Sequence, residues 1–82
     1  MNSAYMRKIV SDEFRELLMF AGLVDDYHCK TKVLDAKGKT LYYSFKTNIG
    51  ECRVQSSRTI FVNAVKCNNL HEARQEIYKY LW

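Results

Sequence analysis

Residues 28–55, HCKTKVLDAKGKTLYYSFKTNIGECRVQ, decide the fold because their side chains alternate in character. One alternating set is mainly apolar and consists of Cys29, Thr31, Val33, Leu41, Tyr43, Phe45, Cys52 and Val54. The complementary set is polar and mostly basic and consists of His28, Lys30, Lys32, Tyr42, Ser44, Lys46, Glu51, Arg53 and Gln55. Successive side chains of a strand point to opposite faces. The pattern therefore predicts an antiparallel sheet with one apolar face and one basic, tyrosine-bearing face.

Turn signals divide this region and its continuation into four predicted strands. The turns fall at 35–39, 48–50 and 56–58, which contain glycine, asparagine or serine. The strands between them are expected at 27–34, 40–47, 51–55 and 59–65. Both faces of the fourth strand are fairly apolar, which is typical of a central strand or of a covered edge.

Two amphipathic helices are expected to flank the sheet. The first has a start signal at Ser11, followed by acidic residues, and continues to about Leu23. Its core-facing stripe consists of Val10, Phe14, Leu17, Leu18 and Ala21. The second begins at the N-cap Asn69, with Glu72 completing a capping box, and its stripe consists of Leu70, Ala73, Ile77 and Leu81. We therefore predict one α+β domain over residues 1–82, in the order α-β-β-β-β-α. Its four-stranded, mostly antiparallel sheet carries both helices on one face, and residues 1–8 form a loose leader.

The chain has a net charge of +4, and its excess of basic side chains lies in the predicted sheet. Residues 27–66 contain eight basic and two acidic side chains, whereas residues 1–26 contain three basic and five acidic ones. A chain of 82 residues has little room for both a core and a deep cleft, so we expect no enzymatic activity. A concentrated basic surface favours an acidic partner.

The candidate partner-binding residues combine the basic set with the adjoining turns. They are Lys30, Lys32, Lys37, Lys39, Tyr42, Lys46, Arg53 and Arg58. The leading hypothesis is a small binding protein that regulates or inhibits a protein partner stoichiometrically through an acidic surface of that partner. Accessory proteins of viruses and mobile elements are often of this type. The alternative is direct binding of RNA or DNA by the same face, because lysine and arginine neutralise phosphates and tyrosine can stack on bases. A lysine face that only maintains solubility is a further alternative.

Three cysteines do not form a disulfide framework, and we expect a reducing, cytoplasmic location. A tetrahedral zinc site would need Cys29, Cys52, Cys67 and His71 to converge. No Cys-x-x-Cys pair is present, so no metal and no cofactor are predicted. Cys67 and His71 alone lack the oxyanion loop of a cysteine nucleophile. No signal peptide or membrane-spanning run is recognised, so no membrane partner is expected.

The predicted order is similar to that of double-stranded RNA-binding domains over about residues 11–82. That family binds RNA through a lysine-rich start of its last helix and a Gly-Pro-x-His loop. Residues 69–74 here read NLHEAR, and the chain contains no proline, so membership is not predicted. A second candidate surface is aromatic and would suit a homodimer or another partner, unless Tyr78 and Trp82 simply close the core. It consists of Tyr78, Tyr80 and Trp82, with Tyr5 and Met6 near the other terminus.

Overall fold

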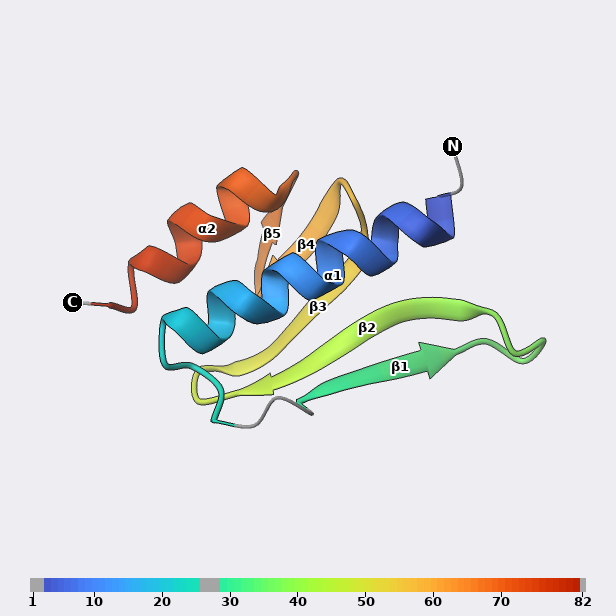
Figure 1. Cartoon of the computed structure of the whole chain (residues 1–82), viewed down its shortest axis with the longest axis horizontal. Helices are drawn as coiled ribbons and strands as arrows, with labels where there is room; N and C mark the ends of the chain where they lie inside the picture. Colours follow the sequence, from blue (N-terminus) through green and yellow to red (C-terminus); the bar gives the residue numbers. More distant parts are fainter. Residues whose placement is uncertain (1–2, 26–28, 82) are drawn as a thin grey trace.

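The structure is a computed structural model that describes residues 3–25 and 29–81, and it forms two layers (Figure 1). One layer consists of the helices α1 (Ser3–Phe20) and α2 (Leu70–Tyr78). The other is an antiparallel sheet of β1 (Lys30–Leu34), β2 (Thr40–Thr47), β3 (Gly50–Ser56), β4 (Thr59–Val62) and β5 (Val65–Cys67). The strands lie side by side in chain order, from β1 at one edge to β5 at the other. The predicted α+β class is confirmed, with five strands in place of four.

The extra strand arises because the predicted fourth strand folds back on itself. A turn at Asn63 and Ala64 separates β4 from β5, and Ile60 pairs with Cys67 across the resulting hairpin. Asn63 has a φ of 57°, in the left-handed region that asparagine tolerates better than most residues. No glycine marks this turn, so the run of apolar residues looks like one continuous strand in the sequence.

The first helix begins earlier than predicted. α1 starts at Ser3, so the prediction of a loose leader over residues 1–8 is wrong from that residue onward, while residues 1–2 lie outside the described residues. Ser11 is not a helix start. It is buried in mid-helix, and its hydroxyl donates to the Lys8 carbonyl oxygen at 2.7 Å, a local bond that satisfies it there. The Arg7 guanidinium donates hydrogen bonds to the carbonyl oxygens of Thr40 and Leu41 at 2.5 and 3.1 Å. These bonds connect the N-terminal part of α1 to β2.

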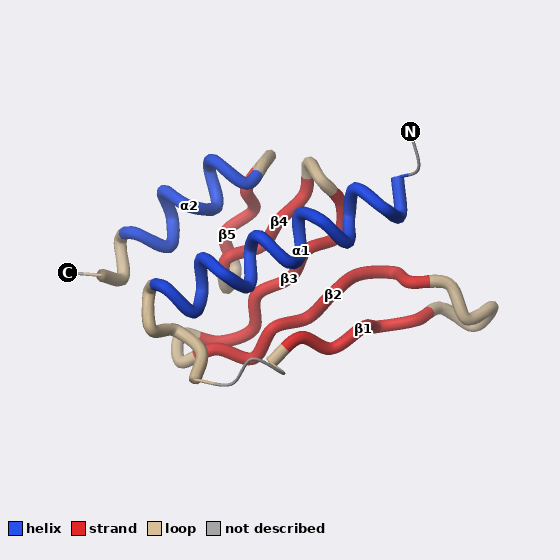
Figure 2. Tube along the Cα trace, viewed as in Figure 1, coloured by secondary structure: helices blue, strands red, loops and turns tan. Residues whose placement is uncertain are grey.

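The core lies between the two layers, where α1 packs on β2 and β3 and α2 packs on β4 and β5 (Figure 2). The rings of Phe14 and Phe45 meet edge to face, with centroids 5.3 Å apart, at the contact between α1 and the sheet. The predicted helical stripes supply the buried members Val10, Phe14, Leu18, Ala73 and Ile77. The predicted N-cap is also confirmed, since the Glu72 amide donates to Asn69 Oδ1 at 2.9 Å. Leu81 lies beyond the end of α2 and is partly exposed.

The predicted alternation holds in β2 and β3 but is reversed in β1. The cross-strand partners of β1 include Lys30↔Phe45, Lys32↔Tyr43, Thr31↔Ser44 and Val33↔Tyr42. Directly paired residues share a face, so Lys30 and Lys32 lie on the helix side of the sheet and Thr31 and Val33 on the other side. β1 is an edge strand outside the main footprint of α1, and an edge tolerates an inward-pointing lysine. His28 lies outside the described residues.

Candidate binding surface

The helices cover one face of the sheet and leave the other uncovered (Figure 1). We call the uncovered side the open face. Its side chains are Thr31, Val33, Tyr42, Ser44, Lys46, Glu51, Arg53, Gln55, Phe61 and Lys66. The pairing register runs one row of them across all five strands, in the order Thr31, Ser44, Arg53, Phe61 and Lys66.

The centre of the open face is organised around Arg53. Its guanidinium carbon lies 4.6 Å from the centroid of the Tyr42 ring, and its direct cross-strand partner on the other side is Phe61. Its Nε donates to Glu51 Oε1 at 2.6 Å, while the Ser44 hydroxyl donates to Glu51 Oε2 at 2.7 Å. An arginine over one aromatic ring, in register with a second aromatic residue and hydrogen-bonded to a carboxylate, is a preorganised and amphipathic surface element.

These contacts set the charge state of the centre. The hydrogen bond from Ser44, and then that from Arg53, lowers the pKa of Glu51 below its ordinary value. The same Glu51 carboxylate raises the pKa of Arg53. Both groups are therefore ionised at neutral pH and neutralise each other locally, so that Arg53 contributes a stacked planar group more than a net positive charge.

A shallow hollow of about 260 Å³ lies on the open face between β3 and β4. Its lining residues are Glu51, Arg53, Gln55, Phe61, Asn63 and Ala64. Pockets for drug-sized ligands enclose about 300–1,000 Å³ and bury most of the ligand. The hollow therefore suits a single protruding side chain of a partner better than a small molecule.

The eight predicted binding residues fall in three places. Tyr42, Lys46 and Arg53 lie on the open face. Lys37 and Lys39 are exposed in the β1–β2 turn, and Arg58 is exposed in the β3–β4 turn. Lys30 and Lys32 lie on the opposite side of the sheet, so the structure does not bring all eight residues together.

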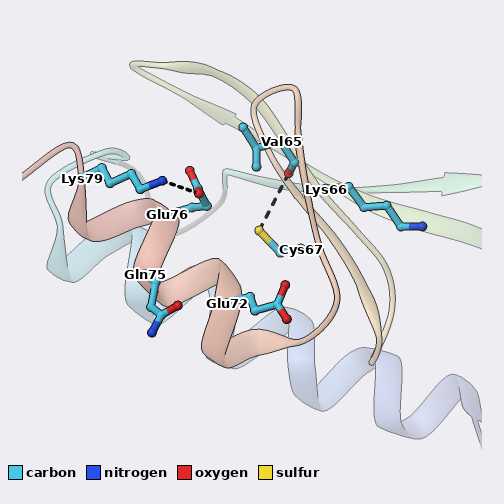
Figure 3. Close-up of a pocket in the computed structure, with 7 residues that line it drawn as sticks. All are labelled: Val65, Lys66, Cys67, Glu72, Gln75, Glu76 and Lys79. Atoms are coloured by element: carbon cyan, nitrogen blue, oxygen red, sulfur yellow. Dashed lines mark hydrogen bonds and ion pairs between the residues drawn. The ribbon is translucent and has the colours of Figure 1, made fainter.

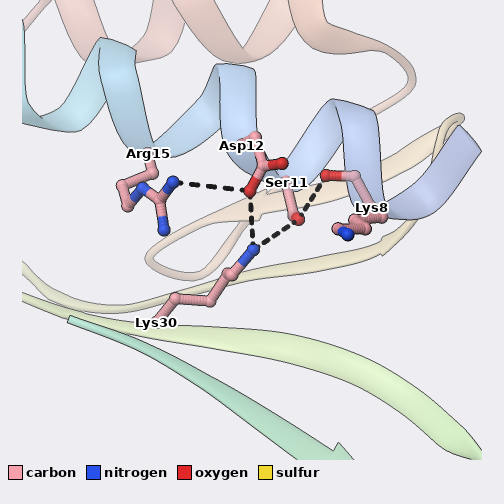
Figure 4. A network of polar contacts seen from close by, with 5 residues as sticks. All are labelled: Lys8, Ser11, Asp12, Arg15 and Lys30. Carbon is pink, nitrogen blue, oxygen red and sulfur yellow. Dashed lines mark hydrogen bonds and ion pairs between the residues drawn. The ribbon is translucent and has the colours of Figure 1, made fainter. Parts of the chain in front are cut away.

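Lys30 instead connects β1 to α1 (Figure 4). Its ammonium lies 2.7 Å from Asp12 Oδ1 and 3.2 Å from Ser11 Oγ, and it sits 4.7 Å from the centroid of the Tyr43 ring. The Lys30 side chain is only 18 % exposed. Its hydrogen bond is the main cause that lowers the pKa of Asp12. Lys30 therefore joins the two layers and is not available to a partner.

Besides Thr31 and Val33, which the reversed alternation of β1 brings to the open face, sequence reasoning missed Phe61 and Lys66. Both depend on the β4–β5 hairpin, which aligns Phe61 with Arg53 on one side and with Lys66 on the other. In a single straight strand the two residues would have had opposite parity. The only signal in the sequence was Asn63, a residue type favoured in tight turns.

Cys52 and Cys67 are buried in the core, and Cys29 is half-buried beside it. No group of three or more His, Cys, Asp or Glu side chains there is arranged to hold a metal ion. Cys67 points toward α2 while Lys66 points away from it (Figure 3). Burial is the main cause that raises the pKa values of the Cys52 and Cys67 thiols, which disfavours the nucleophilic thiolate. His71 Nε2 lies 3.3 Å from Gln75 Nε2.

The aromatic residues near the two termini do not form one surface. Tyr5 lies in the first turns of α1, whereas Tyr78 and Tyr80 lie at the end of α2, and Figure 1 shows these ends at opposite sides of the molecule. All three side chains are exposed, and Trp82 lies outside the described residues.

Neither helix in the described part of the chain is long and apolar enough to cross a membrane. Comparison with known proteins finds no family model that matches the chain, and no significantly similar curated protein or solved structure.

Proposed function

We propose that this chain is a non-enzymatic binding protein that regulates or inhibits a protein partner by covering an acidic surface of that partner with its open face. The arrangement of the open face supports this proposal. Its centre contains Tyr42, Arg53 and Phe61 in contact or in direct register, and its periphery contains the exposed lysines Lys46 and Lys66. Protein interfaces combine aromatic and arginine anchors at the centre with a charged, solvated rim.

The spacing of the cations favours a macromolecular partner. Lys39 lies in the turn just before β2 and Lys46 lies near the far end of that strand, seven residues later, which corresponds to about 23 Å along an extended strand. No small ligand spans that distance. The long axis of the molecule measures 41 Å, so a partner that contacts both lysines covers a large part of its length.

The central carboxylate favours a protein over a nucleic acid. The Glu51 side chain is 45 % exposed on the open face beside Arg53, where it would repel a phosphate backbone. Arg53 already occupies one side of the Tyr42 ring, which reduces the room for a stacked base. A protein surface can instead donate hydrogen bonds to Glu51 while its own acidic groups meet Lys46 and Lys66.

The test is affinity capture with matched variants of the whole chain, in extract treated with nuclease. Lys46→Gln with Lys66→Gln removes two exposed lysines from the open face. Lys8→Gln with Lys32→Gln removes two exposed lysines elsewhere and leaves the same net charge. We expect the control pair to retain one specific protein at equimolar stoichiometry. We expect the open-face pair, and separately Phe61→Ser, to lose it.

Two outcomes would contradict the proposal in different ways. Equal capture by both lysine pairs and by Phe61→Ser would exclude the open face as the contact. Capture that disappears on nuclease treatment, together with direct binding of purified RNA or DNA, would replace the protein partner with a nucleic acid.

A further inference from the structure

The solvent side of the helix layer carries a second set of regularly spaced side chains. On α1 they are Glu13, Glu16, Leu17 and Phe20, which share one helical face. On α2 they are Leu70 and Arg74, one turn apart. These six residues line an open depression of about 560 Å³ between the helices, which we call the helix groove.

The helix groove has an apolar floor and one protruding ring. Leu17 and Leu70 are partly buried and pack on the core below. Phe20 is 77 % exposed, the largest exposed fraction among the large apolar side chains of the described residues. An exposed aromatic ring beside an apolar floor is typical of a surface that associates with another molecule.

The two walls of the helix groove carry opposite charge. The α1 wall contributes the carboxylates of Glu13 and Glu16, and the α2 wall contributes the guanidinium of Arg74. Within residues 3–25 and 29–81, none of these three groups forms an ion pair. The groove is thus complementary in charge to itself, which is the property that a symmetric contact between identical chains needs.

We propose that the helix groove is the contact surface of a symmetric homodimer. α1 and α2 run side by side in the same direction (Figure 1). A two-fold axis that runs along the groove, parallel to both helices, therefore places α1 of each copy over α2 of the other. This rotation causes no displacement along the helix axes. Arg74 of one copy then meets Glu13 and Glu16 of the second copy, and each Phe20 enters the groove of the other.

The distribution of charge over the whole chain agrees with this arrangement. The excess positive charge lies in residues 27–66, mostly in the sheet, whereas residues 1–26 are net acidic. A contact through the helices keeps the basic sheets of the two copies apart. It also leaves the two open faces pointing away from each other, so that one dimer presents two binding surfaces and gains avidity toward a repeated partner. This inference goes beyond the proposed function and does not depend on it.

Sedimentation equilibrium of the purified full chain, over a series of concentrations up to about 100 µM, measures the association directly. We expect the wild type to dimerise. Because Phe20 is exposed, Phe20→Ser should leave the circular dichroism spectrum unchanged while weakening the dimer at least about 30-fold, as expected for a contact hot spot. Phe61→Ser on the open face is the matched control and should dimerise like the wild type.

A charge exchange tests the pairing itself. Arg74→Glu makes both walls of the groove acidic, and Glu13→Lys with Glu16→Lys makes both walls basic. Each variant alone should be monomeric, whereas an equimolar mixture of the two should form a heterodimer. A wild type that stays monomeric at every concentration would overturn the proposal. A dimer whose affinity is unchanged by Phe20→Ser would also overturn it. A mixture of the two charge variants that stays monomeric would overturn it as well.

Discussion

Replacing Lys30 with methionine should destabilise the protein without altering the open face. The residue stands on β1 and contacts α1, and its side chain is only 18 % exposed. Methionine keeps most of the apolar stem and removes the ammonium. Lys46→Met is the matched control, because Lys46 is exposed on the opposite face of the neighbouring strand and has no ion-pair partner among the described residues.

The expected loss follows from the contacts of the Lys30 ammonium. The ion pair with Asp12 has a separation of 2.7 Å, but the Asp12 side chain is 43 % exposed, so solvent screening limits it to about 0.5–1 kcal/mol. The position over the Tyr43 ring adds about 0.5–1 kcal/mol. The free energy of unfolding should therefore fall by about 1–2 kcal/mol, and the melting temperature by about 4–8 °C for each kcal/mol. Lys46→Met should change the free energy of unfolding by less than about 0.5 kcal/mol.

The pH dependence separates the two contributions. The folded protein lowers the pKa of Asp12 below its ordinary value of 3.8, chiefly through Lys30. A carboxyl group with a lowered folded-state pKa stabilises the fold above its unfolded pKa, and this stabilisation is lost as the pH falls through the folded-state pKa. The difference in the free energy of unfolding between wild type and Lys30→Met should be largest at pH 7. Below pH 3.8 this difference should decrease to the contribution of the contact between Lys30 and the Tyr43 ring.

Urea unfolding followed by circular dichroism at several pH values measures these differences. Asp12→Asn and the double variant complete a mutant cycle that isolates the ion pair. An unchanged midpoint for Lys30→Met at pH 7 would refute the assignment of Lys30 to the helix–sheet contact. An equal loss in Lys46→Met would refute it as well.

Three further changes test other parts of the structure. Gly50→Ala should cost about 1–3 kcal/mol in urea unfolding, because Gly50 has a φ of +118° and an added Cβ would lie 2.8 Å from Asn63 Oδ1; an unchanged midpoint would contradict this. Asn69→Ala should cost about 1 kcal/mol, because it removes the acceptor of the first-turn amide of α2, and thermal melting checks it. Glu51→Gln should release Arg53 from its ion pair and tighten binding to an acidic protein surface, as measured by titration calorimetry; weaker binding would show that the partner needs the Glu51 carboxylate.

The sequence predicts β2 and β3 well for a physical reason. Both strands lie under α1, so one side of each must be apolar, and Phe45, Cys52 and Val54 alternate with polar side chains. β1 lies at the edge, where that requirement is weaker, and threonine and lysine do not determine a face. The position of Lys30 depends on Asp12, which lies 18 residues earlier in the chain and forms a contact that no local pattern reveals.

The candidate site was predictable only where it depends on single strands. Tyr42, Lys46 and Arg53 share the expected face because the alternation of β2 and β3 places them there. Phe61 and Lys66 join them through the hairpin at Asn63, whose turn carries no glycine. Sequence patterns thus identify the members of a strand, whereas the composition of a face also depends on which strands pair.

The corrected membership of the open face changes the expected chemistry of its partner. With Lys30 and Lys32 on the helix side and Arg53 paired with Glu51, two exposed lysines without ion pairs among the described residues remain on the face, Lys46 and Lys66. If these two lysines alone contacted phosphates, log K would fall with log salt concentration with a slope of about −2, far from the steep dependence of a dedicated nucleic-acid binder. In the proposed complex, Tyr42 and Phe61 beside Arg53 would add affinity that salt does not screen. A partner bound by this face should therefore be held mainly by packing at the centre, with the lysines selecting for an acidic rim.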